Sequence, residues 1–312
     1  YSNFKAEQEG SVVIGAGSAI FGPAGLQVAD LNGGHKDGRV TGKLGVNWQA
    51  DDETMVYAFA ARGYKPGGAN SAISEFGPET VWDYEAGVKS TLLDGHVRTQ
   101  AGLFYMNYKG FQFDARDPAT GQSGVFNIAN ATIKGAELQV QARAGGFSVD
   151  GGLAYVDSKL DKLTLVNART LPALSQYGPQ CPAGTPSNPP VCFDFAPYLT
   201  SAGGGQNLFS PKWSYNLGVQ YDLDLTADMV LTPRLNYAYV GPRWTNLLYT
   251  PDLDYLKARG LLSAQLTLAM ADWTLEAYGS NLANRKYISG QSGNNEFYGA
   301  PREYGIRASV RF

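Results

Sequence analysis

Apolar and polar residues alternate with a period of two along most of the chain, and the 3.6-residue period of an amphipathic helix is nearly absent. Residues 212–224 show the pattern most fully. Their apolar positions are Trp213, Tyr215, Leu217, Val219, Tyr221 and Leu223, and the polar positions between them include Ser214, Asn216, Gln220 and Asp222. Because successive side chains of a strand point to opposite faces, the pattern predicts long strands with one apolar face and one polar face.

The alternation divides the chain into twelve expected strands. They cover approximately residues 1–9, 38–50, 55–65, 79–93, 97–113, 124–144, 147–160, 212–225, 229–244, 258–270, 273–288 and 303–312. The connections alternate between tight turns, such as residues 94–96 and 145–146, and much longer loops. The long loops are residues 10–37, 66–78, 114–123, 161–211, 245–257 and 289–302.

A hairpin meander with short turns at one end and long loops at the other is typical of an outer-membrane β-barrel. In lipid every backbone polar group must be paired within the protein, so such a sheet must close. A β-sandwich and a propeller are the soluble alternatives. Sandwich strands are typically about 5–6 residues long, roughly half the length expected here, and no blade-length repeat is visible. The predicted fold is therefore an all-β, antiparallel transmembrane barrel.

The composition narrows the class of protein further. Charged residues make up 17% of the chain and hydrophobic residues 44%, so the chain can bury enough apolar surface to fold, and intrinsic disorder is excluded. No run of about 18 apolar residues occurs, which excludes a helical membrane protein. The net charge is −3 and no basic stripe is present, which argues against a nucleic-acid partner.

The two cysteines, Cys181 and Cys192, lie close together in the Pro-rich loop of residues 161–211. No histidine lies near them in the sequence, so a zinc site would lack ligands. Two cysteines in one loop, with no others in the chain, favour a disulfide formed in an oxidising compartment. Two reduced thiols remain the alternative. We expect the disulfide to order a long loop on the extracellular side.

Two segments near the end of the chain carry recognisable motifs. Residues 278–288 (YGSNLANRKYI) contain an Asn-Leu-x-Asn-x-x-Tyr segment, and residues 298–312 (YGAPREYGIRASVRF) contain a Pro-Arg pair and a terminal Phe. These motifs resemble those of TonB-dependent outer-membrane receptors. Similar segments are also found at residues 56–68 (VYAFAARGYKPGG), 79–89 (ETVWDYEAGVK) and 133–138 (IKGAEL). The resemblance covers most of residues 38–312 and is specific in combination.

The resemblance implies a barrel of about 22 strands, a plug domain in its lumen, and a TonB box that engages an energy-transducing complex of the inner membrane. We therefore expect residues 1–312 to be the C-terminal portion of the barrel, with the plug domain and the TonB box absent. Twelve strands cut from a larger barrel expose two edges, which lipid does not tolerate. For this reason we expect strand 303–312 not to close a ring with strand 1–9. A natural twelve-stranded pore is the alternative.

The implied function is active import of a scarce ligand, such as a ferric siderophore, across the cell outer membrane of a Gram-negative bacterium. The implied partners are outer-membrane lipid, the TonB complex acting through the N-terminal part, and the small-molecule ligand. No cofactor is expected. One alternative is a passive outer-membrane pore or an adhesin-like barrel. A second is an outer-membrane hydrolase, for which His35 beside Asp37 is the only candidate pair.

No catalytic or metal-binding constellation stands out, so the candidate functional residues are ligand-binding side chains in the long loops and at the outer strand ends. They are Tyr64, Arg116, Arg243, Trp244, Tyr249 and Tyr298. Aromatic rings supply a large contact area at low entropic cost, and arginine offers a planar fork for carboxylate or phosphate groups. A girdle of aromatic residues at the membrane interface is the alternative for Trp244 and Tyr249.

The alternation also predicts which side chains face lipid and which face the lumen. The expected lipid-facing residues are Trp82, Tyr84, Val88, Leu217, Val219 and Ile306, and the expected lumen-facing residues are Asp83, Glu85, Lys89, Asn216 and Arg307. The last strand ends at Phe312. Its alternation and aromatic terminus resemble the signal that is read by the outer-membrane assembly machinery.

Overall fold

The computed structural model describes residues 2–8, 11–14, 26–30, 33–71, 74–116, 123–174, 177–292 and 295–311. The regular structure is dominated by antiparallel strands. The only helical segments in these ranges are a 3₁₀ turn, η1 (Ala196–Tyr198), and a short helix, α1 (Pro251–Asp254). No helix in the described part of the chain is long and apolar enough to cross a membrane.

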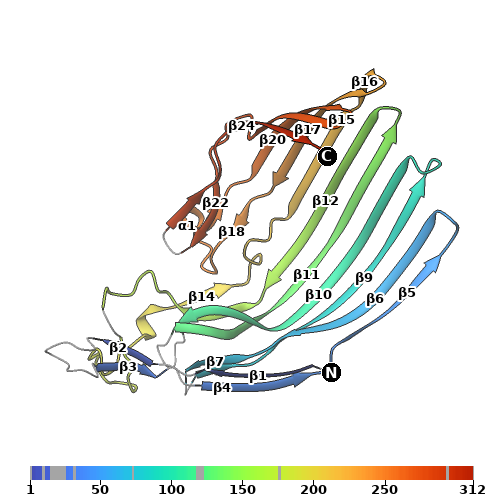
Figure 1. Ribbon diagram of the computed structural model, residues 1–312. Coiled ribbons are helices and arrows are strands. Elements are labelled where there is room, and N and C mark those ends of the chain that lie inside the picture. Colours follow the sequence, from blue (N-terminus) through green and yellow to red (C-terminus); the bar gives the residue numbers. More distant parts are fainter. Residues whose placement is uncertain are drawn as a thin grey trace.

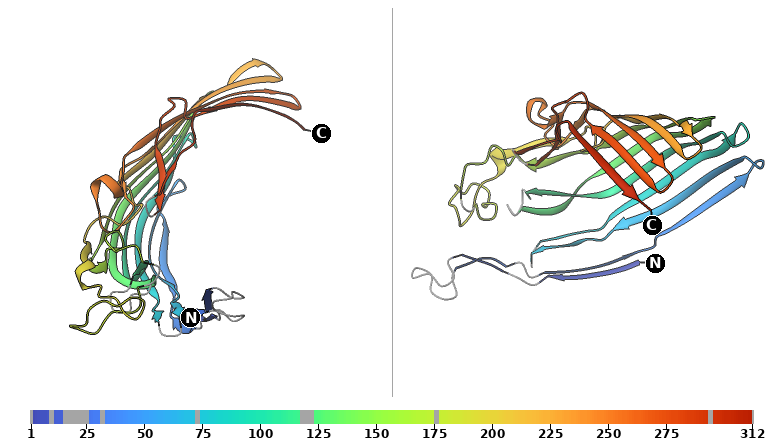
Figure 2. Two further views of the ribbon diagram at one scale, coloured as in Figure 1. Left: turned by 90° about the vertical axis from the view of Figure 1, so that its left-hand side faces the viewer. Right: turned by 45° about the horizontal axis from the view of Figure 1, so that its top comes forward.

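A curved sheet of 12 strands forms the body of the molecule (Figure 1, Figure 2). In spatial order its main path is β5 (Gly42–Gln49), β6 (Thr54–Lys65), β9 (Glu79–Leu92), β10 (Val97–Arg116), β11 (Ser123–Ala144), β12 (Phe147–Leu160), β15 (Trp213–Tyr221), β17 (Met229–Val240), β20 (Arg259–Met270), β21 (Trp273–Ser280) and β24 (Glu303–Val310). The remaining strand, β16 (Leu223–Thr226), pairs with β17 beside this path. The sheet is therefore a meander of hairpins in chain order.

Short turns lie at one end of the sheet and the long connections lie at the other (Figure 1). The β9–β10 turn reverses the chain through Leu93 and Asp94, with φ of 55° and 54°, and then Gly95, with φ of 89°. Positive φ at consecutive turn residues matches the twist of the flanking strands, which is why such turns join tight hairpins. β10 and β11 are 20 and 22 residues long, whereas a tilted strand needs only about 9–11 residues to cross the hydrocarbon. Both strands are therefore long enough to cross a membrane and to extend beyond it.

The expected strands from residue 38 onward are confirmed, but four of them differ at an end or are interrupted. The strand expected over 38–50 begins at Gly42, and the strand expected over 212–225 is interrupted at Asp222 between β15 and β16. The strand expected over 229–244 ends at Val240 and resumes as β18 (Arg243–Trp244), because Pro242 between them has no N–H to donate to a ladder. The strand expected over 273–288 ends at Ser280. The next residue, Asn281, has a φ of 45°, which turns the chain out of the strand.

Five of the six expected long loops are not wholly irregular, because they contain short strands. These additional strands are β2 (Ser11–Ile14), β3 (Leu26–Asp30), β4 (Gly33–Arg39), β7 (Gly68–Ser71), β8 (Ser74–Phe76), β13 (Lys162–Val166), β14 (Leu199–Gly203), β19 (Tyr255–Leu256), β22 (Ile288–Ser292) and β23 (Asn295–Tyr298). The strand expected over 1–9 is present as β1 (Ser2–Gln8), but it pairs with β4 in a separate two-stranded sheet. These strands are short or rich in glycine, so their sequences carry little alternation.

One face of the main sheet is apolar and carries the residues predicted to face lipid. Trp82, Tyr84, Leu217 and Ile306 are all exposed. Val88 lies in an apolar groove of this face with Leu103. Val219 lies in a second apolar groove with Ile306.

The opposite face is polar and carries the five residues predicted to face the lumen, Asp83, Glu85, Lys89, Asn216 and Arg307. Lys89 and Asn216 line the same polar hollow, and Lys89 lines a second hollow together with Glu85. Arg307 Nη1 lies 3.1 Å from Glu276 Oε1. The two predicted sets therefore lie on opposite faces of the sheet, one apolar and one polar, as the alternation predicted.

The main sheet is open within the described residues. β24 pairs only with β21, and β5 pairs only with β6 at the other end of the path. No pairing joins β24 to β1 in these ranges, which confirms that strand 303–312 does not close a ring with strand 1–9. Phe312 lies outside the described residues. Each open edge carries unpaired backbone N–H and C=O groups, which lipid does not satisfy.

The buried apolar side chains gather at the long-loop end of the sheet. One cluster contains Ala131, Leu160, Ala202 and Leu247 and joins β11, β12, β14 and the loop after β18. A second cluster contains Val166, Phe193 and Phe195, with Leu171, Tyr177 and Tyr198 packed around it. The loops therefore fold into a packed layer. We call residues 161–211, 241–257 and 288–298 the outer loop layer.

Candidate functional site

The disulfide predicted from the sequence is present in the outer loop layer. Cys181 and Cys192 are joined, with their Cα atoms 4.9 Å apart, and both are buried. Backbone hydrogen bonds support the closed loop: Cys181 N donates to Phe193 O at 3.2 Å, and Asn188 N donates to Cys192 O at 3.0 Å. The bond thus anchors a segment that has little other regular structure.

Replacing both cysteines with serine is expected to loosen this loop without unfolding the main sheet. The closed loop spans 11 residues of sequence separation, so the chain-entropy model assigns the bond at most about 3 kcal/mol of local stability. Limited proteolysis with thermolysin should cleave residues 161–211 faster in the variant. Reduction of the wild-type protein is the control and should give the same acceleration. Equal cleavage rates in all samples would contradict the prediction.

Arg116, predicted as a ligand-binding residue, lies against this loop. Its guanidinium carbon lies 4.9 Å from the centroid of the Tyr177 ring and 5.9 Å from that of Phe195. A guanidinium over an aromatic face is stabilised by the charge distribution of the ring. Arg116 therefore fastens the end of β10 to the disulfide loop.

Trp244 and Tyr249 lie together in the second part of the outer loop layer. The Trp244 ring centroid is 5.3 Å from that of Tyr249 and 4.9 Å from that of Tyr255. Tyr249 has a φ of 49°, a conformation that bulky residues adopt only when their surroundings impose it. Its hydroxyl donates to Gln206 O at 2.7 Å. Burial raises the pKa of Tyr249, so the hydroxyl stays protonated and keeps this bond.

A buried ion pair joins the first two segments of the outer loop layer, residues 161–211 and 241–257. Arg169 Nη1 donates to Asp254 Oδ2 at 2.9 Å, and Arg169 Nη2 donates to Asp254 Oδ1. Asp254 is fully buried at the end of α1 and also accepts a hydrogen bond from Thr250 N at 2.9 Å. Burial raises the pKa of Asp254, but the hydrogen bonds from Arg169 and Thr250 outweigh it and hold the pKa below its ordinary value. The carboxyl is therefore ionised and holds two loops together.

Arg243 ties the same region to the β22–β23 hairpin. Its side chain is buried, and Nη2 donates to Ser289 O at 3.2 Å. Burial, followed by the positive charge of Arg259, lowers the pKa of Arg243. Thr245 Oγ1 donates to Gln291 Oε1 at 2.8 Å. The hairpin is thus held against the loop after β18 at two points.

The remaining predicted residues, Tyr64 and Tyr298, lie apart from these clusters. Tyr64 is half-buried near the end of β6. Tyr298 is 72% exposed on β23, and its hydroxyl lies 3.2 Å from Glu296 Oε2. Of the six predicted ligand-binding residues, the structure brings together Arg243, Trp244 and Tyr249. Arg116 lies in the disulfide region of the same layer.

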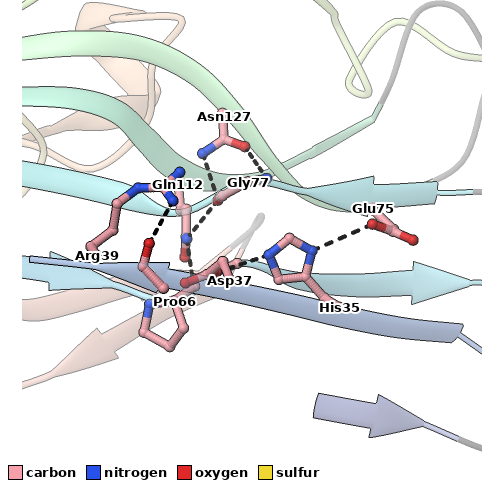
Figure 3. A network of polar contacts seen from close by, with 10 residues as sticks. His35, Asp37, Arg39, Pro66, Glu75, Gly77, Gln112 and Asn127 are labelled. Carbon is pink, nitrogen blue, oxygen red and sulfur yellow. Dashed lines mark hydrogen bonds and ion pairs between the residues drawn. The ribbon is translucent and has the colours of Figure 1, made fainter. Parts of the chain in front are cut away.

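His35 and Asp37 form a polar cluster with Glu75, where β4 meets the β7–β8 hairpin (Figure 3). His35 Nε2 lies 2.9 Å from Asp37 Oδ2, and Nδ1 lies 3.4 Å from Glu75 Oε2. Asp37 Oδ2 also accepts a hydrogen bond from Gly67 N at 2.8 Å. Both ring nitrogens of His35 therefore face carboxylates. The sequence placed His35 and Asp37 in a loop, but they lie on β4.

Amide side chains from the neighbouring strands hold this hairpin in place (Figure 3). Gln112 Nε2 donates to Pro66 O at 2.8 Å, and Asn127 Nδ2 donates to Gly77 O at 2.9 Å. In turn, Gly77 N donates a hydrogen bond to Asn127 Oδ1 at 2.6 Å. These bonds satisfy backbone groups of the hairpin that form no ladder, which suits a structural role for the network.

Three residues of the site were missed by sequence reasoning: Arg169, Asp254 and Arg259. Asp254 had one usable signal, because Thr250 followed by Pro251 is a common start of a helix and predicts a short helical segment there. Arg169 lies 85 residues from Asp254 in the sequence, so no local pattern links the two. Among the residues that the structure describes, no group of three or more His, Cys, Asp or Glu side chains is arranged to hold a metal ion.

Comparison with known proteins places this architecture in one family. The family model for the TonB-dependent receptor-like β-barrel matches residues 18–282. The metal-pseudopaline receptor of Pseudomonas aeruginosa is 32% identical over 125 residues, which are 39% of this chain and 17% of that protein. The pesticin receptor of Yersinia pestis is 29% identical over 170 residues, which are 52% of this chain and 24% of that protein.

A solved structure shows the same fold. The ferric yersiniabactin uptake receptor of Yersinia pestis superposes with a TM-score of 0.68 at 22% sequence identity, over 90% of this chain and 39% of that chain. The chain therefore spans less than half the length of these similar proteins.

Proposed function

The chain belongs to the TonB-dependent receptor-like β-barrel family, and we propose that it is part of an outer-membrane receptor that imports a metal chelate such as a ferric siderophore. The observation that carries this proposal is the family match over residues 18–282. The names of the relatives support the class of ligand, because one is a receptor for metal-pseudopaline. The outer loop layer is the part of this chain that meets the ligand first.

In the proposed receptor, Trp244 and Tyr249 contribute aromatic contact area to ligand binding, and Arg243 contributes positive charge. Their mutual packing supports this role, because rings already fixed in position lose little entropy when a ligand binds. Arg116 supports the layer by stacking on Tyr177. Tyr64 and Tyr298 are further candidate contacts, one at a strand end and one on an exposed hairpin.

The proposed receptor also needs parts that lie outside residues 1–312. The open edges of β5 and β24 support the proposal that these residues are the C-terminal portion of a larger barrel. A plug domain and a TonB box would lie in the remainder of the receptor. The polar face of the sheet suits a wall that contacts such a plug or water, and the apolar face suits outer-membrane lipid.

A hydrolase is less well supported, because its only candidate histidine is already engaged. A general base needs a ring nitrogen within hydrogen-bond reach of a nucleophile or of water. In His35 one nitrogen faces Asp37 and the other faces Glu75. The cluster therefore fits a structural contact between β4 and the β7–β8 hairpin better than it fits catalysis.

Uptake by the full-length receptor tests the proposal. The complete open reading frame is expressed in a Gram-negative strain that lacks its own siderophore receptors, under iron limitation. Radiolabelled ferric yersiniabactin and metal-pseudopaline are the two probes, since these ligands are named for similar proteins. We expect accumulation of at least one labelled chelate, and we expect it to stop when the inner-membrane TonB complex is deleted.

The deletion strain separates active import from the alternatives. Accumulation that continues without the TonB complex would point to a passive pore instead. Absence of accumulation for both probes, with the receptor present in the outer membrane, would count against these two ligands. A wider panel of ferric hydroxamates and catecholates would then decide whether siderophores are the right class.

A further inference from the structure

Two arginines meet at the outer end of the lumen wall, where β17 ends and β20 begins. Arg259 is the first residue of β20 and is in register with Val240, the last residue of β17. Arg243 follows three residues after Val240 and pairs in register with Leu256 of β19. Figure 1 shows β18, β22 and α1 gathered at this end of β20. Arg243 and Arg259 therefore reach one small region from two strands.

Each of these arginines has a buried donor that finds no acceptor in the described part of the chain. Arg243 is 5% exposed, and its Nη1 is buried without a hydrogen-bond partner, although Nη2 is bonded to Ser289 O. Arg259 Nη1 is also buried without a hydrogen-bond partner. A buried donor without an acceptor destabilises the folded state, and it does so more strongly when it carries charge. Two such donors close together are uncommon in a folded protein unless a bound acceptor satisfies them.

Arg234, another arginine of the polar face, has an acceptor for each of its two Nη groups. Arg234 Nη2 donates to Asp150 Oδ1 at 2.7 Å, and Nη1 donates to Gln220 Oε1 at 2.9 Å. By contrast, no ion pair among the described residues includes Arg243 or Arg259. The charge that affects the pKa of Arg243 is that of Arg259, which is also positive. Within the described residues, the region therefore carries two positive charges that have no ion-pair partner.

We propose that Arg243 and Arg259 form a binding site for an oxyanion, namely a carboxylate or phosphate-like group of the imported ligand. This inference deepens the proposed function and rests on it for the source of the anion. Guanidinium groups bind such anions through paired, charge-assisted hydrogen bonds, and an oxygen between the two Nη1 atoms satisfies both donors. It also offsets the repulsion between the two cations.

Aromatic rings and a hairpin complete the surroundings of this site. The Arg259 guanidinium carbon lies 4.8 Å from the centroid of the Tyr287 ring, which leaves the edge of the guanidinium to bind the anion. Trp244 is the neighbour of Arg243 in β18. The β22–β23 hairpin covers Arg243 through Ser289. Because the hairpin is hydrogen-bonded to the guanidinium of Arg243, an anion that binds this guanidinium also affects the position of the hairpin.

Anion titration of the purified full-length receptor tests the site. Inorganic phosphate and acetate serve as separate probes at constant ionic strength, and the thermal midpoint Tm of the receptor is measured in detergent. A ligand that binds only the folded state raises Tm with its concentration. We expect a saturable rise with at least one of the two anions. The anion with the lower half-saturation concentration identifies the preferred group, phosphate or carboxylate.

Substitutions assign the response to these two residues. Arg259→Gln and, separately, Arg243→Gln should raise the half-saturation concentration by about tenfold or more, because each removes a charge-assisted donor pair. Arg259→Lys keeps the charge and loses the fork, so its response should fall between those of Arg259→Gln and wild type. Lys257→Gln is the matched control. It removes an exposed positive charge two residues from Arg259 and should leave the response unchanged.

Two results would overturn the site. A wild-type receptor that shows no saturable response to either anion would mean that the pair is neutralised from within the complete receptor. Equal responses in wild type, Arg259→Gln and Arg243→Gln would place the anion elsewhere. Both results are independent of the uptake experiment, because a receptor that imports no chelate still reports anion binding through its Tm.

Discussion

Replacing Asp254 with asparagine is expected to separate the two loops that the Arg169–Asp254 ion pair joins. The substitution keeps the shape of the side chain but leaves Arg169 beside a neutral amide. Loss of one partner of a buried ion pair costs about 3–5 kcal/mol. The lower end applies here, because the Arg169 side chain is 22% exposed whereas that of Asp254 is fully buried.

Hydrogen–deuterium exchange can measure this separation locally. Gly203 N donates to Leu247 O at 3.1 Å across the two loops, so its exchange reports their opening. A loss of roughly 3 kcal/mol corresponds to exchange that is about a hundredfold faster at this amide. Asp252→Asn is the control, because Asp252 is exposed on the same helix. Unchanged exchange at Gly203 in the Asp254 variant would refute a role for the ion pair in joining the loops.

The same ion pair predicts how the wild-type loops respond to pH. The folded-state pKa of Asp254 is lowered, so the stability that it contributes is present above the ordinary carboxyl pKa and is lost as the pH falls through the folded value. The loops should therefore stay joined from neutral pH down to mild acid and separate only below about pH 4. The asparagine variant should lack this transition, since it has no carboxyl to protonate.

Replacing Leu217 with arginine is expected to destabilise the barrel far more than replacing its neighbour Asn216 with arginine. Leu217 lies within β15 on the apolar face, and Asn216 lies on the polar face. An arginine on the lipid face near the midplane of the bilayer costs about 2–4 kcal/mol, whereas an arginine in the lumen keeps access to water. Because the two positions are adjacent, strand propensity and depth in the membrane are closely matched.

The comparison is made with the full-length receptor folded into phospholipid vesicles. Urea titration gives the free energy of unfolding of each variant, and the amount of protein assembled in the outer membrane gives an independent measure. Equal losses for the two variants would mean that both faces of β15 have the same surroundings, which is incompatible with a wall between lipid and lumen.

The outcome for individual elements shows what alternation can and cannot predict. The strands of the main sheet were predicted closely because period-two alternation is imposed along the whole of each strand by two different environments. The hairpins β13–β14 and β22–β23 were missed. They form separate two-stranded sheets outside the main sheet, so no such pair of environments is imposed on them. The breaks after Val240 and Ser280 depend on single residues, Pro242 and Asn281, within otherwise continuous patterns.

The sequence by itself determined the class of fold, the two faces of the sheet and the disulfide, because each depends on local periodicity or on a pair of nearby residues. Only the tertiary structure decided which loop residues meet. Arg169 reaches Asp254 from a distant loop, and Arg243 and Arg259 approach each other because Gly241 and Pro242 turn the chain between β17 and β18. Contacts of this kind depend on how whole loops pack, and no residue pattern along the chain encodes that packing.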